Sequence, residues 1–266
     1  MTLVFKIKGL AAIVQTNHSL RELKRGVPLC EALTYQALIN EATWTMQKKL
    51  KLQVFQASEK VHFHTDAEIA VLAEACPDLQ KMIFKFNPFY CSSYLNLSMF
   101  ERLRHFETWG GDYETSGLAQ LLEIVGANLE SLHLCHVEEI GLDQLVQITQ
   151  NCRNVKKLII ENCSFNLDEA DLNEENLCIK NLKVPPLLEL RLFKVINMPV
   201  EMLQMILKKA LNIENIEIDG DVGLNDEHVL DLFIDNKLSK LKDLLIYSSK
   251  YDKILFLNFL NIFSGI

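Results

Sequence analysis

A pattern of apolar and polar positions, apolar-x-x-apolar-x-apolar, recurs eight times along the chain. Its apolar positions are Leu52/Phe55/Ala57, Leu79/Met82/Phe84, Leu103/Phe106/Thr108, Leu129/Leu132/Leu134, Val155/Leu158/Ile160, Leu187/Leu190/Leu192, Ile213/Ile216/Ile218 and Leu241/Leu244/Ile246. Of these 24 positions, 22 hold Leu, Ile, Val, Met or Phe, and successive copies begin 24 to 32 residues apart. The alternation at the end of each copy predicts a short strand that buries its apolar side chains on one face.

Stretches with helical periodicity precede most of the predicted strands. Apolar residues fall three or four positions apart at 69–73, 118–125, 142–148, 202–207 and 229–233, which is the spacing of one helix face. Alternating strands and helices predict parallel strands, and a period of about 20 to 29 residues carrying L-x-x-L-x-L is typical of leucine-rich repeats. We therefore predict an α/β leucine-rich-repeat solenoid, a right-handed horseshoe with parallel strands on its concave face. It should span residues 49–266 in about eight repeats.

The two ends of the chain depart from this pattern. Residues 1–48 lack the repeat, and the apolar face of 31–50 predicts a helical N-terminal segment. The apolar run 254–263 is interrupted by Asn258 and Asn261 and is too short to span a bilayer. We expect this run to form a helix that closes the last repeat.

Composition narrows the class of partner. The formal net charge is −8 and the isoelectric point is near 5.4, which disfavours nucleic acid and anionic membrane as partners. Seven cysteines form no clustered framework, so we expect reduced thiols in a cytoplasmic or nuclear protein.

The sequence holds no motif that indicates catalysis. It has no phosphate-binding glycine loop, His-Glu-x-x-His or Gly-x-Ser-x-Gly, so we expect a non-enzymatic protein without a cofactor. His133-x-Cys135-His136 is the one cluster with zinc-binding side chains. His133 and Cys135 should point outward from one strand, and a third ligand would have to come from a neighbouring repeat. We favour an interpretation of them as ordinary concave-face residues and predict no metal.

The residues between and just after the apolar positions should form the concave face. They include the aromatic and Arg side chains that dominate protein interfaces, together with basic residues toward one end and acidic residues toward the other. Our candidates for contact with a protein target are Lys81, Ile83, Lys85, His105, Glu107, Trp109, His133, Ile159, Arg191, Phe193, Glu217 and Tyr247.

Cysteines at fixed positions carry a family resemblance. Cys76 and Cys152 stand three residues before the first apolar position of their repeats, and Cys163 and Asn87 stand at the ninth position. This arrangement resembles the cysteine-containing repeats of F-box/leucine-rich-repeat proteins. We expect these cysteines to be small buried residues near turns.

The resemblance implies a substrate-recognition subunit of a cullin–RING ubiquitin ligase. Residues 1–48 would then be a degenerate F-box that binds a Skp-type adaptor, with Leu3 and Trp44 as the matching positions. The alternative is a cap that shields the first repeat. The chain would in that case be a stand-alone scaffold or regulator that binds a protein through the same concave face. A weaker alternative is an enzyme whose site the sequence does not show.

Overall fold

The computed structural model describes residues 19–23, 50–56, 73–85, 99–110, 118–166, 183–220, 222, 228, 238–247 and 255–258. The chain forms two compact units, Met1–Leu129 and Glu130–Ile266, called here the N-terminal and the C-terminal unit. Among the described residues, none of the helices has the length and apolar character needed to cross a membrane.

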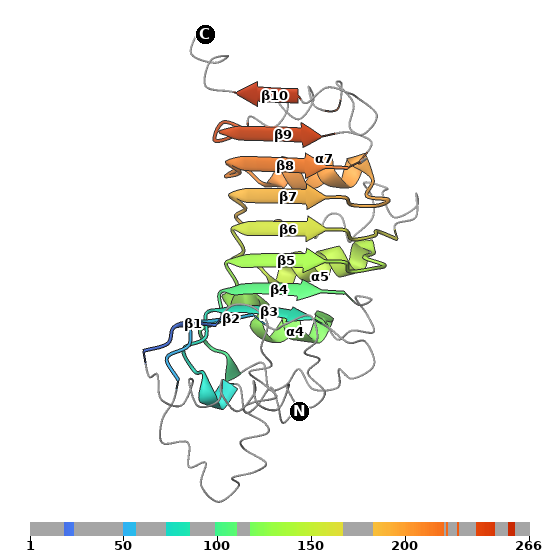
Figure 1. Ribbon diagram of the computed structural model, residues 1–266. Coiled ribbons are helices and arrows are strands. Elements are labelled where there is room, and N and C mark those ends of the chain that lie inside the picture. Colours follow the sequence, from blue (N-terminus) through green and yellow to red (C-terminus); the bar gives the residue numbers. More distant parts are fainter. Residues whose placement is uncertain are drawn as a thin grey trace, which may run out of the picture. The chain divides into compact units, whose positions relative to one another are not determined.

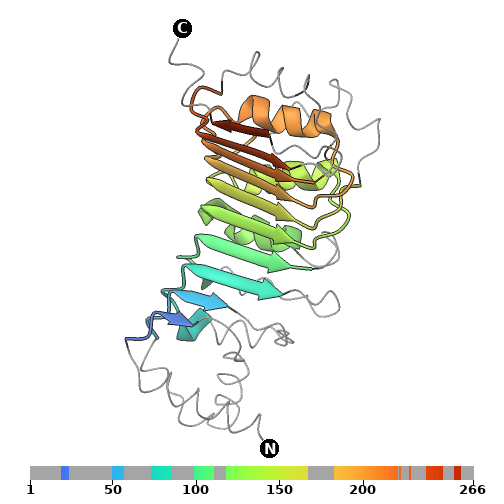
Figure 2. The same cartoon turned by 45° about the horizontal axis from the view of Figure 1, so that its top comes forward.

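The C-terminal unit is built on five parallel strands in register. They are β5 (Ser131–Cys135), β6 (Lys157–Glu161), β7 (Glu189–Phe193), β8 (Asn215–Asp219) and β9 (Asp243–Tyr247). Each residue pairs with the equivalent residue of the next repeat, as Leu132 does with Leu158. Helices α5 (Leu142–Asn151) and α7 (Val200–Lys209) cover one face of these strands, as Figures 1 and 2 show.

The described residues of the N-terminal unit form four parallel strands. They are β1 (Glu22–Leu23), β2 (Val54–Gln56), β3 (Lys81–Lys85) and β4 (His105–Trp109). Its described part also contains helix α4 (Leu118–Val125), the short 3₁₀ helix η2 (Gly126–Asn128) and helical residues 73–75. The sequence pattern did not predict β1, which pairs with β2 from within the segment expected to be helical. Apart from residues 19–21, the rest of that segment lies outside the described residues.

The predicted apolar positions form the core. Of the 22 whose side chains the structure describes, 21 are buried; the remaining two, Ala57 and Phe84, lie outside the described side chains. The exception is Ile246 on β9, which is partly exposed. It pairs with Leu255 of an antiparallel strand instead of a further parallel repeat. Side chains of α4, α5 and α7 at the predicted apolar positions are buried as well.

Two patterns of backbone hydrogen bonding recur in every complete repeat of the C-terminal unit from β6 onward. A single carbonyl accepts both N–H groups that lead into the next strand: Glu130 O accepts from Lys156 and Lys157, and Lys156 O from Leu188 and Glu189. At the other end of the strand, the next residue has a positive φ and donates its N–H to the last residue of the following strand. Asn162, with a φ of 50°, donates in this way to Phe193 O at 2.8 Å.

The end of the chain departs from the sequence prediction. Within the apolar run 254–263, residues Leu255–Asn258 form strand β10, which pairs antiparallel with β9. The expected closing helix is therefore wrong at these four residues. A sheet edge presents unpaired backbone groups, and a short apolar run can satisfy them as a strand. Periodicity alone does not separate these two outcomes over so few residues.

Thr108 on β4 is the polar exception among the described core positions, and it provides a test of packing in this core. Its side chain is fully buried, and its hydroxyl has no hydrogen-bond partner among the described residues. We predict that Thr108→Val raises the free energy of unfolding by about 1 kcal/mol, since a buried hydroxyl without a partner costs about 1–3 kcal/mol.

Thr149 on α5 is the matched control for that substitution. It is also buried, but its hydroxyl donates to Val146 O at 2.9 Å. Thr149→Val should therefore lower the stability by about 1 kcal/mol. Denaturant unfolding of both variants measures the two changes, and the same sign for both would contradict the assigned hydrogen bonding.

Candidate functional site

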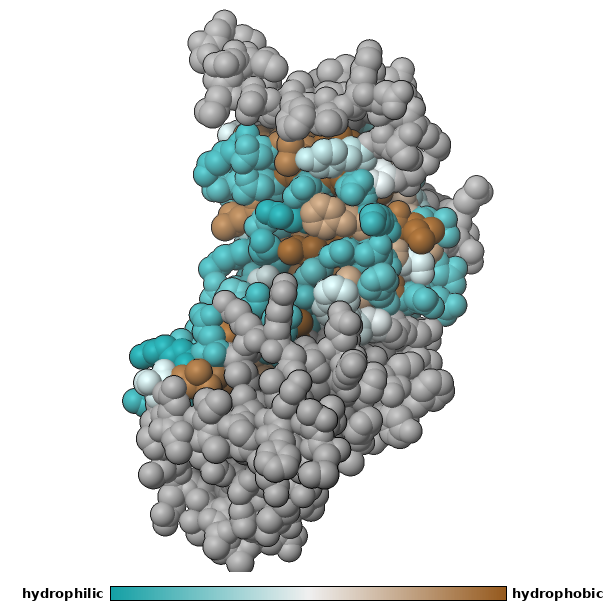
Figure 3. All heavy atoms as spheres, in the orientation of Figure 1, coloured by the Kyte–Doolittle hydropathy of each residue, from teal (hydrophilic) through white to brown (hydrophobic). Residues whose placement is uncertain are grey.

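The strands of the C-terminal unit leave one face uncovered by α5 and α7. Because side chains alternate along a strand, the residues between the core positions belong to this face. We call it the open face; its residues are Ser131, His133, Cys135, Lys157, Ile159, Glu161, Glu189, Arg191, Phe193, Asn215, Glu217, Asp219, Asp243, Leu245 and Tyr247. All are at least partly exposed except Cys135, which is buried. Figure 3 shows hydrophilic side chains predominating on this side, with hydrophobic ones scattered among them.

The strand register places the sequence-predicted residues of this unit in columns. One column across β5–β8 contains, as successive neighbours, His133, Ile159, Arg191 and Glu217. Phe193 and Tyr247 lie in a second column at the strand ends, separated by Asp219. These side chains therefore share a partly exposed face in this unit, and their contact with a partner stays a prediction.

In the N-terminal unit, the candidates pair between β3 and β4. Lys81 pairs with His105, and Ile83 pairs with Glu107. The backbone of Lys85 pairs with that of Trp109, but the side chain of Lys85 lies outside the described set, as do Leu3 and Trp44.

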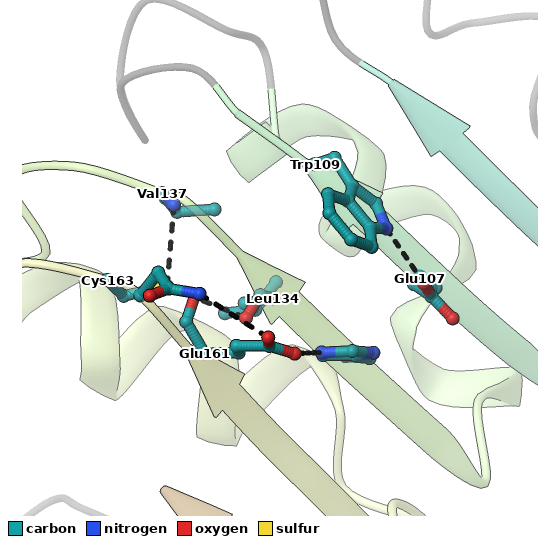
Figure 4. Close-up of polar contacts among 8 residues, drawn as sticks. Glu107, Trp109, Leu134, Val137, Glu161 and Cys163 are labelled. Atoms are coloured by element: carbon teal, nitrogen blue, oxygen red, sulfur yellow. Dashed lines mark hydrogen bonds and ion pairs between the residues drawn. The ribbon is translucent and has the colours of Figure 1, made fainter. Parts of the chain in front are cut away.

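A hydrogen bond fixes the indole of Trp109. Its Nε1 donates to Glu107 Oε1 at 2.7 Å (Figure 4). Both residues were predicted as partner contacts, but the bond between them was not predicted. The ring is therefore presented in a defined orientation, which lowers the entropy lost when a partner packs on it.

An ion-pair network crosses three strands of the open face. Lys157 Nζ lies 2.9 Å from Glu189 Oε1, which also contacts Arg191 Nε. Arg191 Nη1 in turn lies 3.4 Å from Glu217 Oε2. Burial raises the pKa of Glu189, but Lys157 and Arg191 outweigh this effect, so the pKa lies below its ordinary value of 4.5. Two residues predicted as partner contacts, Arg191 and Glu217, are thus ion-paired within the face itself.

The open face as a whole is acidic. It contains two cationic residues and five carboxylates, a formal net charge of −3 with histidine neutral. Both cationic residues, Lys157 and Arg191, form ion pairs with Glu189. Asp219 forms no ion pair with any residue that the structure describes. Negative charge and aromatic rings therefore meet at the end of the strands, where Phe193, Asp219 and Tyr247 are adjacent.

The candidate metal-binding residues come together with a partner from the next repeat. His133 Nε2 lies 3.2 Å from Glu161 Oε2. The ligand atoms of His133, Cys135 and Glu161 all lie within 4.8 Å of one another. Glu161 was missed as a ligand because it lies 26 residues beyond Cys135 in the sequence, and only the strand register reveals the contact. Cys135 points to the open face, as predicted, but its thiol is buried there.

Three other described cysteines have the structural role predicted for them. Burial raises the pKa of Cys76 and Cys152 to about 12 and that of Cys163 to about 11, so these thiols are protonated at neutral pH and unreactive. The Cys163 sulfur accepts from Val137 N at 3.4 Å and lies 3.5 Å from Leu134 O (Figure 4). It therefore links the turns of two consecutive repeats.

Parallel strands in register, buried apolar positions and helices on one face define the class of fold: an α/β leucine-rich-repeat solenoid, as predicted. Among solved structures, the chain is similar to an internalin from Listeria monocytogenes, at 12% sequence identity and a TM-score of 0.44. The match covers 92% of this chain and 71% of the internalin chain. No protein-family model matches the sequence, and no curated protein does. We base the fold assignment on the strands themselves.

The ion-pair network yields a prediction about pH. Glu189→Gln should lower the free energy of unfolding at neutral pH, because it removes the carboxylate that Lys157 and Arg191 share. The folded-state pKa of Glu189 lies below 4.5. The carboxylate's contribution is therefore complete above that pH and is lost as the pH falls through the folded-state value.

Denaturant unfolding over a descending pH series measures this difference. The stability gap between the wild type and Glu189→Gln should narrow below pH 4.5. Glu138→Gln, at an exposed glutamate in the turn after β5, is the control and should show little difference at any pH. A gap that stays constant with pH would contradict the assigned network.

Proposed function

We propose that this protein is a binding module whose open face holds a protein segment that carries basic side chains. The observation that carries the proposal is the adjacency of Phe193, Asp219 and Tyr247 at the ends of three successive strands. Aromatic rings attract Lys and Arg through their faces, and a neighbouring carboxylate pairs with the same cation. The net charge of −3 on the face favours the same type of partner.

The rigidity of the face supports this proposal. Ion pairs across β6, β7 and β8 connect Lys157, Glu189, Arg191 and Glu217. The strands that carry these residues are paired over their full length. A partner that binds here meets side chains already in position, so less conformational entropy is lost on association. A regular face of this kind suits a segment of another protein that lies across several strands.

The first test compares large apolar side chains on and off the open face. We expect Phe193→Ala with Tyr247→Ala to weaken capture of protein partners by the immobilised chain by at least about tenfold. Leu211→Ala is the matched control, because Leu211 is a large apolar residue that is 65% exposed but lies in the turn before β8. Quantitative mass spectrometry of the captured proteins, with melting temperatures of all variants, makes the comparison.

Charge is tested separately with Asp219→Asn. This variant should lose affinity for the same partners, and the loss should shrink as salt concentration rises, because salt screens exposed charges. Partners that bind both open-face variants as well as they bind the wild type would overturn the proposal. Equal loss with Leu211→Ala would place binding elsewhere.

We propose further that the module acts as the substrate-recognition subunit of a cullin–RING ubiquitin ligase, in the cytoplasm or nucleus. The support is the position of Cys76, Cys152 and Cys163 in their repeats, which resembles that of F-box/leucine-rich-repeat proteins. Their burial at turns agrees with the role that such residues have in stacked repeats. The adaptor would bind the N-terminal segment. The alternative is a scaffold that binds the same partner without a ligase.

Co-purification with a Skp-type adaptor separates these two functions. A ligase subunit should bring down the adaptor, and Trp44→Ala should abolish the association while leaving open-face binding intact. Trp109→Ala is the matched tryptophan control and should retain the adaptor. The absence of adaptor from the wild-type preparation would favour the scaffold.

A further inference from the structure

Three side chains with different metal-binding atoms converge at the ends of β5 and β6. Cys135 and Glu161 pair directly in the strand register, and His133 lies two residues before Cys135 on the same strand face. Their sulfur, carboxylate and imidazole atoms lie within 4.8 Å of one another, with His133 Nε2 and Glu161 Oε2 at 3.2 Å. Figure 4 draws the contact of the Glu161 carboxylate with His133 as a dashed line.

The backbone around this cluster is held firmly. His136 follows β5 with a φ of 55°, and its N–H donates to Glu161 O at 2.8 Å, which ties the ends of the two strands together. The Asn162 amide donates to Glu161 Oε1 at 3.3 Å. This bond engages one carboxylate oxygen and leaves the other directed at His133. Hydrogen bonds of this kind orient the ligands of metal sites.

We propose that His133, Cys135 and Glu161 bind a zinc ion. Sulfur, nitrogen and oxygen donors together suit the borderline character of Zn²⁺. Tetrahedral zinc places such donors about 3.3–3.6 Å apart. The 3.2 Å between His133 Nε2 and Glu161 Oε2 is close to this separation. The Cys135 sulfur lies within 4.8 Å of both other ligand atoms, so a small side-chain movement would bring it to the same separation.

Charge balance supports zinc in preference to a simple His–Glu contact. Metal binding deprotonates a coordinating thiol, so Cys135 and Glu161 would supply two negative charges to one divalent cation. Burial of the Cys135 sulfur keeps water from competing for the position. The side chains of His133 and Glu161 remain 16% and 33% exposed, which gives the ion a route of entry.

Among the residues that the structure describes, three protein ligands lie at this site, which leaves the fourth zinc position for a further ligand. This is the arrangement of zinc sites that bind a water or an external ligand rather than of closed structural sites. Because the site lies on the open face, the fourth ligand can come from solvent or from a bound protein. The zinc site itself does not depend on the proposed protein partner.

Cobalt substitution of the full chain tests this proposal. After removal of metals by a chelator, addition of Co²⁺ to the wild type should produce the near-ultraviolet absorption of a cobalt–thiolate bond. Competition with a chromophoric chelator should give one zinc ion at this site. Cys135→Ser should abolish the cobalt–thiolate band, and Glu161→Gln should weaken zinc binding while the band remains at saturating metal.

Matched controls use the neighbouring residues of the same types. Cys163→Ser removes a buried thiol outside the cluster, and His136→Gln removes an exposed imidazole beside it; both variants should bind zinc as the wild type does. Asn162→Gly removes the orienting amide and preserves the positive φ, which glycine tolerates. It should lower zinc affinity by about 10–100-fold, as loss of an outer-shell partner does.

Several outcomes would overturn the assignment. They are the absence of a cobalt–thiolate band in the wild type, a band that survives Cys135→Ser, or equal losses in Cys163→Ser and Cys135→Ser. Circular dichroism of each variant checks its folding. If Cys135→Ser does not fold, Glu161→Gln and Asn162→Gly, which alter partly exposed side chains, decide the matter through zinc affinity alone.

Discussion

In-register pairing of consecutive repeats is the interaction on which the described structure depends. Each strand exchanges backbone hydrogen bonds with the equivalent residues of the next repeat, and one carbonyl before each strand accepts two N–H groups from its successor. This register stacks Leu132 on Leu158 and Leu158 on Leu190. A shift by a single residue would turn the whole apolar set of a strand away from the core. Burial of the apolar positions therefore maintains the register, and the register maintains their burial.

The same register creates the functional surfaces. Residues 26 or more positions apart in sequence become neighbours because each repeat places its equivalent residue beside the last. The network through Glu189, the column of Phe193, Asp219 and Tyr247, and the cluster at Cys135 are three results of one geometry. Each combines side chains that no local motif contains. Binding sites in such a solenoid are therefore composed across repeats, and a substitution in one repeat alters a column without disturbing the core.

Much of the fold was predictable because its main signal is local. Alternation around Leu132 and Leu134 predicts a strand, and the three described helices begin and end within a few residues of the predicted apolar faces. The ends of the chain were less predictable. β1 is only two residues long and carries no period of its own, and β10 is a strand because the edge of β9 is available for pairing. Both depend on a neighbouring strand and not on their own composition.

The sequence by itself determined the repeat length, the buried face of each strand and the list of residues on the opposite face, because these follow from periodicity within a few residues. Only the tertiary structure decided which of those residues touch. It paired Arg191 with Glu189 and Glu217, buried the thiol of Cys135, and brought Glu161 to His133. The physical reason is that side-chain contacts across a parallel sheet depend on register and on turn geometry such as the positive φ of Asn162. Neither is encoded in the spacing of apolar residues along the chain.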